Sequence, residues 1–209
     1  MDKGLQITSK ALEMFMKYGI RSVSMDDISN ELGMSKKTLY QFFGKKEDLV
    51  MACVQHDLNM DHEMCQEIFK PEKNAIDELL ELGQHYLGVL QSINPSAIYD
   101  LAKYYPKAWK LMVTEHRGGY YRKVFTENLK KGISQKLFRT EIDVDAATRF
   151  YLHRTSTLIN DELYPRKDFE MQSLYMESLR YHIRGIGTEK GIKRFEKVMT
   201  QLKNQSHAA

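Results

Sequence analysis

The side chains best suited to contact another molecule lie in residues 35–46, SKKTLYQFFGKK. Lysine ammonium groups pair with phosphates as point charges, while threonine, glutamine and tyrosine side chains hydrogen bond to phosphates or to base edges. A helix N-terminus also attracts anions. The stretch therefore indicates a DNA-contacting surface. With one serine upstream, the candidate DNA-binding residues are Ser24, Ser35, Lys36, Lys37, Thr38, Tyr40, Gln41 and Lys46.

Two short helices are expected to position these side chains. Ser24 is a helix N-cap, and Asp27 stands at the capping-box position, so a helix should begin at Met25. Gly33 ends it, because glycine tolerates the left-handed conformation. Ser35 caps a second helix of about two turns. The apolar residues predicted to form its buried stripe are Leu39, Phe42 and Phe43.

A longer pattern runs through the first fifty residues, as Ala11, Phe15, Tyr18, Gly19, Ile28 through Gly33, Ser35, Lys36, Thr38, Leu39, Tyr40, Phe43, Lys46, Glu47 and Leu49. In this pattern the chain resembles the tetracycline-repressor-like (TetR) family of bacterial transcription regulators. The resemblance implies that Thr38 and Tyr40 lie at the DNA surface and that Lys36 and Lys37 lie at the tip of the recognition helix. It also implies that Lys46 reaches a phosphate. The chain departs from the family at position 45, where a lysine replaces the usual small polar cap.

The chain as a whole indicates an all-α fold. It has 209 residues, 42% of them hydrophobic, and only four prolines, and its apolar residues recur at helical spacing. A net charge of +3 is too small to require a nucleic-acid partner, so the local distribution of charge matters more. The expected domains are a three-helix helix-turn-helix DNA-binding domain, residues 1–46, and a larger helical ligand-binding and dimerisation domain, residues 47–209.

Caps and breaks divide the chain into further helices. One helix over residues 3–18 should pack behind the helix-turn-helix, and a long helix is expected over 106–131, with a kink at Gly118 and Gly119. The other expected helices cover 46 into the sixties, 72–94, 96–104, 143 or 145 to 163, 168–184, and a final segment capped by Thr188.

The resemblance also implies a homodimer and a small-molecule inducer. The helices near 145–163 and 168–185 would pair with their copies across a two-fold axis. Candidate dimer residues are Phe150, Arg154, Leu158, Leu174, Tyr175, Leu179 and His182. An aromatic-rich region suits an apolar ligand, although the same residues could be core. Candidate ligand-binding residues are Tyr86, Tyr99, Tyr105, Trp109, Tyr121 and Phe150.

A second basic region spans residues 103–139 and carries ten lysines and arginines among many aromatic residues. It could be an accessory nucleic-acid surface or a site for an anionic ligand. We favour a plainer interpretation, in which the charges cover the exposed side of a helix whose aromatic side is core.

Other functional classes find little support. Two cysteines, no leader-like segment and no apolar run of about eighteen residues favour a reduced cytoplasmic protein with no membrane anchor. Cys53, His56, His62 and Cys65 have ligand-like spacing, but on one helix the two pairs point to opposite sides, so neither a metal site nor a cofactor is expected. The seven histidines are scattered and no nucleophile motif is present, so an enzyme is not expected. A regulator without a responsive pocket remains an alternative.

Overall fold

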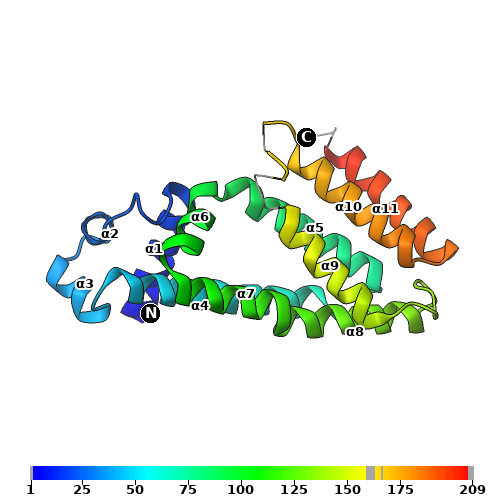
Figure 1. Ribbon diagram of the computed structural model, residues 1–209, viewed down its shortest axis with the longest axis horizontal. Helices are drawn as coiled ribbons and strands as arrows, with labels where there is room; N and C mark the ends of the chain where they lie inside the picture. The colour runs from blue at the N-terminus through cyan, green and yellow to red at the C-terminus, as the bar shows by residue number, and fades with distance from the viewer. Residues whose placement is uncertain (1, 159–162, 166, 207–209) are drawn as a thin grey trace. The chain divides into compact units, whose positions relative to one another are not determined.

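The computed structural model describes residues 2–158, 163–165 and 167–206, and these residues form eleven α-helices (Figure 1). The described part contains no β-strand and only one isolated bridge, between Phe138 and Gly187. The chain divides into two compact units. We call Met1–Met64 with Gln91–Glu115 the head unit, and Cys65–Leu90 with His116–Ala209 the body unit.

The helices of the head unit are α1 (Lys3–Tyr18), α2 (Met25–Glu31), α3 (Lys36–Phe42), α6 (Pro95–Tyr104) and parts of α4 (Lys46–Ile68) and α7 (Pro106–Gly118). Apolar side chains from all of these helices meet in one core, to which α3 contributes through its inner face. Ile7, Ile28 and Leu39 are fully buried there. The domain boundary predicted at residue 46 coincides with the first residue of α4, but it falls inside this unit. That residues 1–46 form a separate domain therefore stays a prediction.

The caps of α2 and α3 confirm the predicted helix-turn-helix. The Ser24 hydroxyl accepts from Asp27 N–H at 3.1 Å, and Asp27 accepts from Ser24 N–H at 2.8 Å. Gly33 has a φ of 59°, and the Ser35 hydroxyl accepts from Thr38 N–H at 3.1 Å. Both helices therefore begin where their serines predict.

A tight corner between α1 and α2 is fixed by α6. Gly19 adopts a φ of 86°, and Ser96 of α6 lies so close that no Cβ would fit at position 19. Asn94 caps α6 and donates its backbone N–H to Met16 at 2.7 Å. Asp100, which is buried, accepts from the backbone N–H of Arg21 at 2.8 Å. The corner between α1 and α2, directly before the helix-turn-helix, is thus hydrogen bonded to α6.

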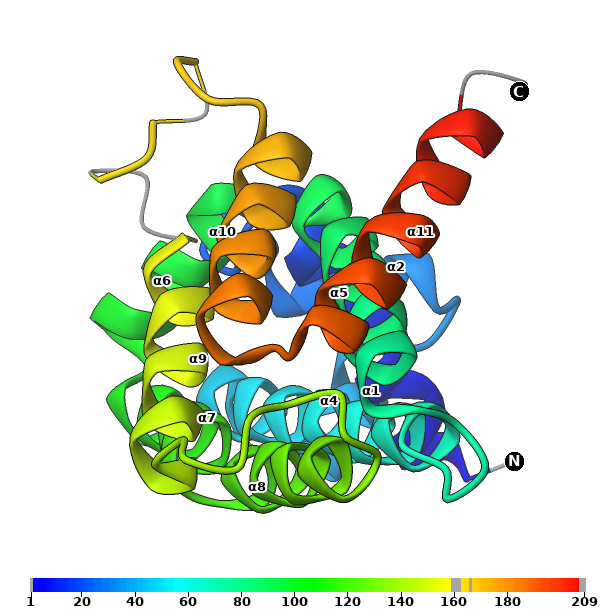
Figure 2. The same cartoon turned by 90° about the vertical axis from the view of Figure 1, so that its right-hand side faces the viewer.

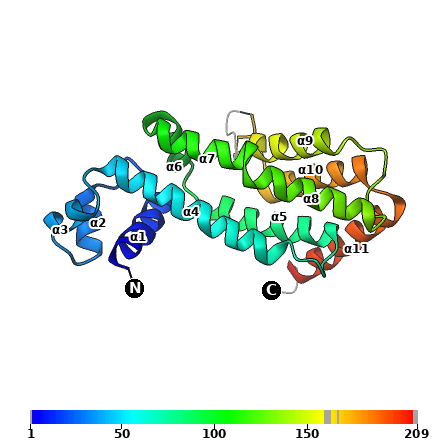
Figure 3. The same ribbon diagram turned by 90° about the horizontal axis from the view of Figure 1, so that it is seen from below.

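The body unit contains α8 (Tyr120–Ser134), α9 (Val144–Leu158), α10 (Met171–Ile186), α11 (Glu189–Ser206) and most of α5 (Ala75–Ser92). Within it, α9 packs against α8 and α10, and α11 follows α10 (Figures 2 and 3). Glu78 of α5 is buried and pairs with Lys131 of α8 at 2.5 Å. Asn128 also donates to Glu78, at 2.8 Å, so the buried carboxylate is doubly satisfied.

Several predicted helix limits differ from the structure. The expected helix over 106–131 is two helices, α7 and α8, because the chain leaves the helical conformation at Gly119. The α5 helix begins at Ala75 rather than 72, since Asn74 caps it. The helix expected to reach 163 is α9, which is described to Leu158, and residues 159–162 lie outside the described part.

Candidate DNA-binding surface and effector-binding unit

The outer face of α3 presents most of the predicted DNA-binding side chains. Lys37, Tyr40 and Gln41 are exposed, whereas Leu39 on the opposite face is fully buried. Phe42 was expected in the core, but its side chain is 44% exposed. The reason is that α3 ends there, and Phe43 turns into an extended conformation that packs it against the core. The surface therefore combines two exposed lysines, Lys36 and Lys37, with two hydrogen-bonding side chains and an exposed aromatic ring.

Three of the predicted hydroxyl groups are already engaged within the head unit. Ser24 and Ser35 cap their helices, and the Ser35 hydroxyl lies 2.8 Å from the hydroxyl of Thr38, which is half-buried. These groups hold the shape of the reading surface. A direct contact of any of them with DNA stays a prediction.

The lysines of the reading surface differ in their partners. Lys36 pairs with Asp26 of α2 at 2.7 Å, and the hydrogen bond with this carboxylate raises the pKa of Lys36. Asp26 lies on a different helix and outside the lysine-rich segment, so the charges of that segment alone did not predict this pair. Lys37 is exposed and forms no ion pair with the residues that the structure describes. Its charge is therefore the more available for a phosphate.

Lys46 points into the head unit. Its ammonium donates to the carbonyl of Ile20 at 2.5 Å and lies 5.7 Å from the ring centroid of Phe15. Burial lowers the pKa of Lys46, although nearby Asp100 and Glu47 oppose that effect. In this arrangement Lys46 closes the α1–α2 corner, and its predicted phosphate contact would require the side chain to leave the Ile20 carbonyl.

The predicted ligand-binding residues are divided between the two units. In the head unit, Tyr99 is 56% exposed beside Lys103, while Tyr105 and Trp109 pack against the head core. The other three, Tyr86, Tyr121 and Phe150, belong to the body unit. Tyr121 is only 1% exposed, whereas Phe150 is 72% exposed.

The predicted dimer residues also fall into different environments within the body unit. Leu158, Tyr175 and Leu179 are buried inside it. Arg154, Leu174 and His182 are half-buried. The outermost aromatic side chains on α9 and α10 are Phe150 and Tyr181, each 72% exposed. The sequence analysis did not name Tyr181 as a candidate dimer residue. The exposed Arg184, three residues later on the same helix, marks this side of α10 as its outer face.

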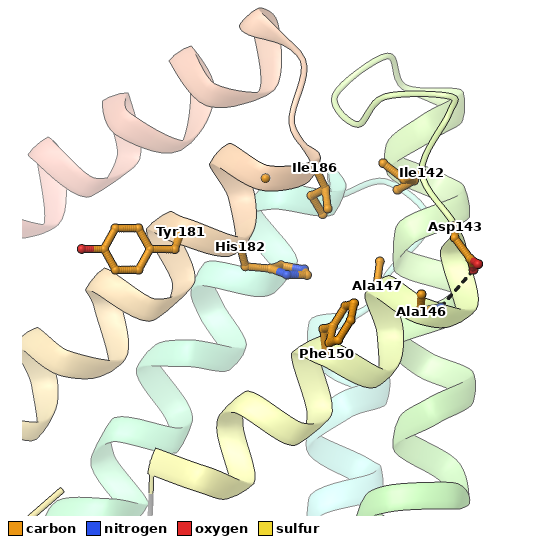
Figure 4. Close-up of a pocket in the computed structure, with 9 residues that line it drawn as sticks. Ile142, Asp143, Ala146, Ala147, Phe150, Tyr181, His182 and Ile186 are labelled. Atoms are coloured by element: carbon orange, nitrogen blue, oxygen red, sulfur yellow. Dashed lines mark hydrogen bonds between the residues drawn. The ribbon is translucent and has the colours of Figure 1, made fainter. Parts of the chain in front are cut away.

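An open hollow of about 390 Å³ lies between the start of α9 and the end of α10. His182 and Ile186 face Phe150 and Ala147 across it, while the Tyr181 ring extends away from Phe150 (Figure 4). Asp143 caps α9 at its rim by accepting from Ala146 N–H at 3.0 Å. The remaining lining residues are Ile142, Ala146 and Gly185.

A polar cluster adjoins this hollow, in which Tyr151 and Tyr175 are buried while Arg154 and His182 are half-buried. The guanidinium carbon of Arg154 is 4.6 Å from the ring centroid of Tyr151 and 6.0 Å from that of Tyr175. The two tyrosine hydroxyls are 3.4 Å apart. The ring of His182 stands 5.0 Å from Tyr151, and burial together with Arg154 lowers the pKa of His182 to about 3. This histidine is therefore neutral at physiological pH.

The basic region 103–139 does not form one surface. It is divided between the head unit and the body unit. Several of its charges have acidic partners: Arg122 pairs with Asp145, Lys130 with Glu127 and Lys131 with Glu78. Its aromatic residues Tyr121 and Phe125 are core. These positions agree with the plainer interpretation of the region.

The side chains with ligand-like spacing on α4 have separate partners. Cys53 is buried, donates to the carbonyl of Thr8 at 3.4 Å and has its pKa raised by burial. His56 lies 3.0 Å from the hydroxyl of Ser9. Among the described residues, no group of three or more potential ligands is arranged for a metal ion. None of the helices in the described part of the chain has the length and apolar character that crossing a membrane requires.

Comparison with known proteins agrees with this architecture. Residues 7–53 match the family model for bacterial regulatory proteins of the tetR family. The repressor KstR2 of Mycobacterium tuberculosis is 24% identical over 190 residues, which cover 90% of this chain and 94% of that protein. A TetR-family regulator of Cytophaga hutchinsonii has the same fold, with a TM-score of 0.72, 18% identity and coverage of 90% of this chain and 98% of the other.

The reduced form of Escherichia coli NemR is similar in fold, with a TM-score of 0.72, 13% identity and coverage of 90% and 98% of the two chains. The matched residues 7–53 contain most of α1, all of α2 and α3, and the beginning of α4. These helices form and support the exposed face of α3. Residues 7–53 therefore form a DNA-binding domain of the tetR type, and the chain as a whole is similar to DNA-binding transcriptional regulators of that family.

Proposed function

We propose that this regulator is a homodimeric repressor that binds a palindromic operator and leaves it when a small molecule binds the larger helical domain. The single observation that carries the DNA-binding part is the exposed set Lys37, Tyr40 and Gln41 on α3, held by a capped α2 and a buried Leu39. A helix of this kind enters the major groove, and two copies about one DNA turn apart read a palindrome.

The proposed dimer surface is the outer side of α9 and α10. Phe150 and Tyr181 are exposed there on either side of an open hollow. Exposed aromatic side chains of this size are typical anchors of protein interfaces. We propose this pair, with Leu174 and the exposed edge of His182, as the interface, while the buried Leu158, Tyr175 and Leu179 support it from inside.

Release by a ligand is the proposed regulatory step. A ligand can lower operator affinity only by binding one conformation more tightly than another. The Asp100 carboxylate of α6 accepts from the backbone N–H of Arg21, and Asn94, the N-cap of α6, donates to the carbonyl of Met16, so α6 is held directly against α1 and the loop that follows it. A shift of α6 would therefore move α1 with it.

The outer face of α3 is tested by measuring the dissociation constant of the protein for a pool of DNA duplexes of random sequence. Replacing Lys37 with alanine should weaken binding and reduce the salt slope by about one, because one phosphate contact is lost. Tyr40→Phe should weaken binding across all sequences. Lys123→Ala, an exposed lysine of α8, is the matched control and should leave affinity unchanged. Equal losses in Lys37→Ala and Lys123→Ala would contradict the assigned surface.

A further inference from the structure

Two of the three guanidinium nitrogens of Arg154 have no hydrogen-bond partner among the described residues. Its Nη1 donates to the Ser178 hydroxyl at 3.1 Å, but Nε and Nη2 are buried and have no hydrogen-bond partner. No carboxylate among the described residues pairs with this guanidinium. Buried polar groups are nearly always hydrogen bonded, so two such donors on one charged group call for a partner.

The two open donors form one side of the guanidinium fork. Nε–H and the adjacent Nη2–H point in the same direction, which is the geometry that accepts both oxygens of a carboxylate. The ring of Tyr151 is stacked on the face of the guanidinium, with 4.6 Å between the ring centroid and the guanidinium carbon. Stacking uses the face of the group and leaves its in-plane donors available.

The described side chains that contact this guanidinium carry no negative charge. Tyr151 and Tyr175 are each 2% exposed, and burial raises the pKa of both, so their phenols are neutral. His182 is neutral as well, because burial lowers its pKa. The phenol of Tyr86 is near enough to raise the pKa of Tyr175 further. Arg154 is thus a single positive charge in a largely aromatic environment.

We infer that Arg154 anchors the carboxylate of an effector molecule whose apolar body packs against the tyrosines between α9 and α10. This inference rests on the proposed ligand response and specifies its chemistry: the effector is an organic acid. The apolar body gains from contact with aromatic side chains, and the carboxylate supplies both acceptors for the open fork.

Matched acids and alcohols test the charge requirement. Calorimetric titration would compare 1-naphthoate with 1-naphthalenemethanol and decanoate with decan-1-ol. The wild-type protein should bind at least one acid about ten- to a hundredfold more tightly than its alcohol. Arg154→Met should abolish that preference. Arg149→Met is the matched control, because Arg149 lies on the same helix, is exposed and pairs with Asp145 at 2.8 Å.

Several results would overturn the inference. These are equal binding of acids and alcohols, no binding of either acid, or an acid preference that survives in Arg154→Met. Because the titration uses no DNA, its failure is separate from that of the proposed function: a protein that binds operator DNA but no acid refutes only the anchor.

Thermal unfolding without ligand gives a second test. Donors that are buried without acceptors are costly, so Arg154→Met should leave Tm unchanged or raise it. If Arg154 instead served only to brace α9 against α10 through Ser178, the variant should unfold at a lower temperature, and a drop larger than that of Ser178→Ala would contradict the inference.

Discussion

The backbone N–H of Arg21 donates to the buried carboxylate of Asp100 at 2.8 Å, although 79 positions separate the two residues. This bond fixes α6 to the loop between α1 and α2, directly before the helix-turn-helix. The guanidinium of Arg21 also stacks on Tyr104, 4.5 Å from its ring centroid, at the other end of α6. The helix-turn-helix is therefore braced by α6, which begins at Pro95, more than fifty residues after α3 ends at Phe42.

Asp100→Ala should destabilise the head unit by about 1–3 kcal/mol, because the Arg21 N–H loses its acceptor at a partly buried position. Urea unfolding followed by the fluorescence of Trp109, the single tryptophan, measures this. Asp100→Asn keeps an oxygen acceptor and is the control. Equal stability of Asp100→Ala and the wild type would show that the bond contributes nothing.

Gly19→Ala should cost about 1–3 kcal/mol, since position 19 has a φ of 86° and a Cβ there would lie 2.3 Å from the Ser96 hydroxyl. Gly88→Ala is the opposite case. A Cβ at this exposed position of α5 meets nothing within 4 Å, so helix propensity should stabilise the protein by about 0.5–1 kcal/mol. Thermal unfolding of both variants checks the pair, and the account fails if both shift in the same direction.

Replacing both Phe150 and Tyr181 with serine should convert the proposed dimer to a monomer. Each aromatic anchor at an interface contributes about 2 kcal/mol or more. Size-exclusion chromatography with light scattering gives the mass directly. Tyr99→Ser removes another exposed aromatic side chain, in the head unit, and should leave the mass of the dimer unchanged. A dimer that persists in the double variant would place the interface elsewhere.

His182 should make the protein less stable in acid. Burial and Arg154 lower its pKa to about 3, whereas the unfolded chain binds the proton near its usual pKa of 6.5. Between these values the unfolded state holds one more proton, so stability falls as pH falls, by up to about 1.4 kcal/mol per pH unit. Urea midpoints at pH 7, 6, 5 and 4 should decline less steeply in His182→Gln. Identical slopes would refute the assignment.

The local features of the fold were predictable from the sequence. Ser24, Gly33 and Ser35 place the limits of α2 and α3 because caps and left-handed turns depend on neighbouring residues only. The division of α7 from α8 was signalled by two adjacent glycines, but the choice between a kink and a break depends on packing.

The features that failed or were missed depend on contacts between distant segments. Phe42 is exposed because Phe43 leaves the helix, which an apolar spacing rule does not anticipate. Lys36 forms an ion pair with Asp26 of another helix, and Lys46 points into the head unit, where it donates to the carbonyl of Ile20. The open fork of Arg154 is likewise visible only once α9 and α10 are packed.

The central claim is that α3 reads DNA as one half of a symmetric pair. The most direct test is selection from a pool of randomised duplexes with the purified protein, at low salt and without ligand. The account predicts enrichment of a palindrome whose half-sites lie about one helical turn apart, and loss of that enrichment in a Lys37→Ala, Tyr40→Phe double variant. Failure of the wild-type protein to enrich any palindromic sequence would contradict it.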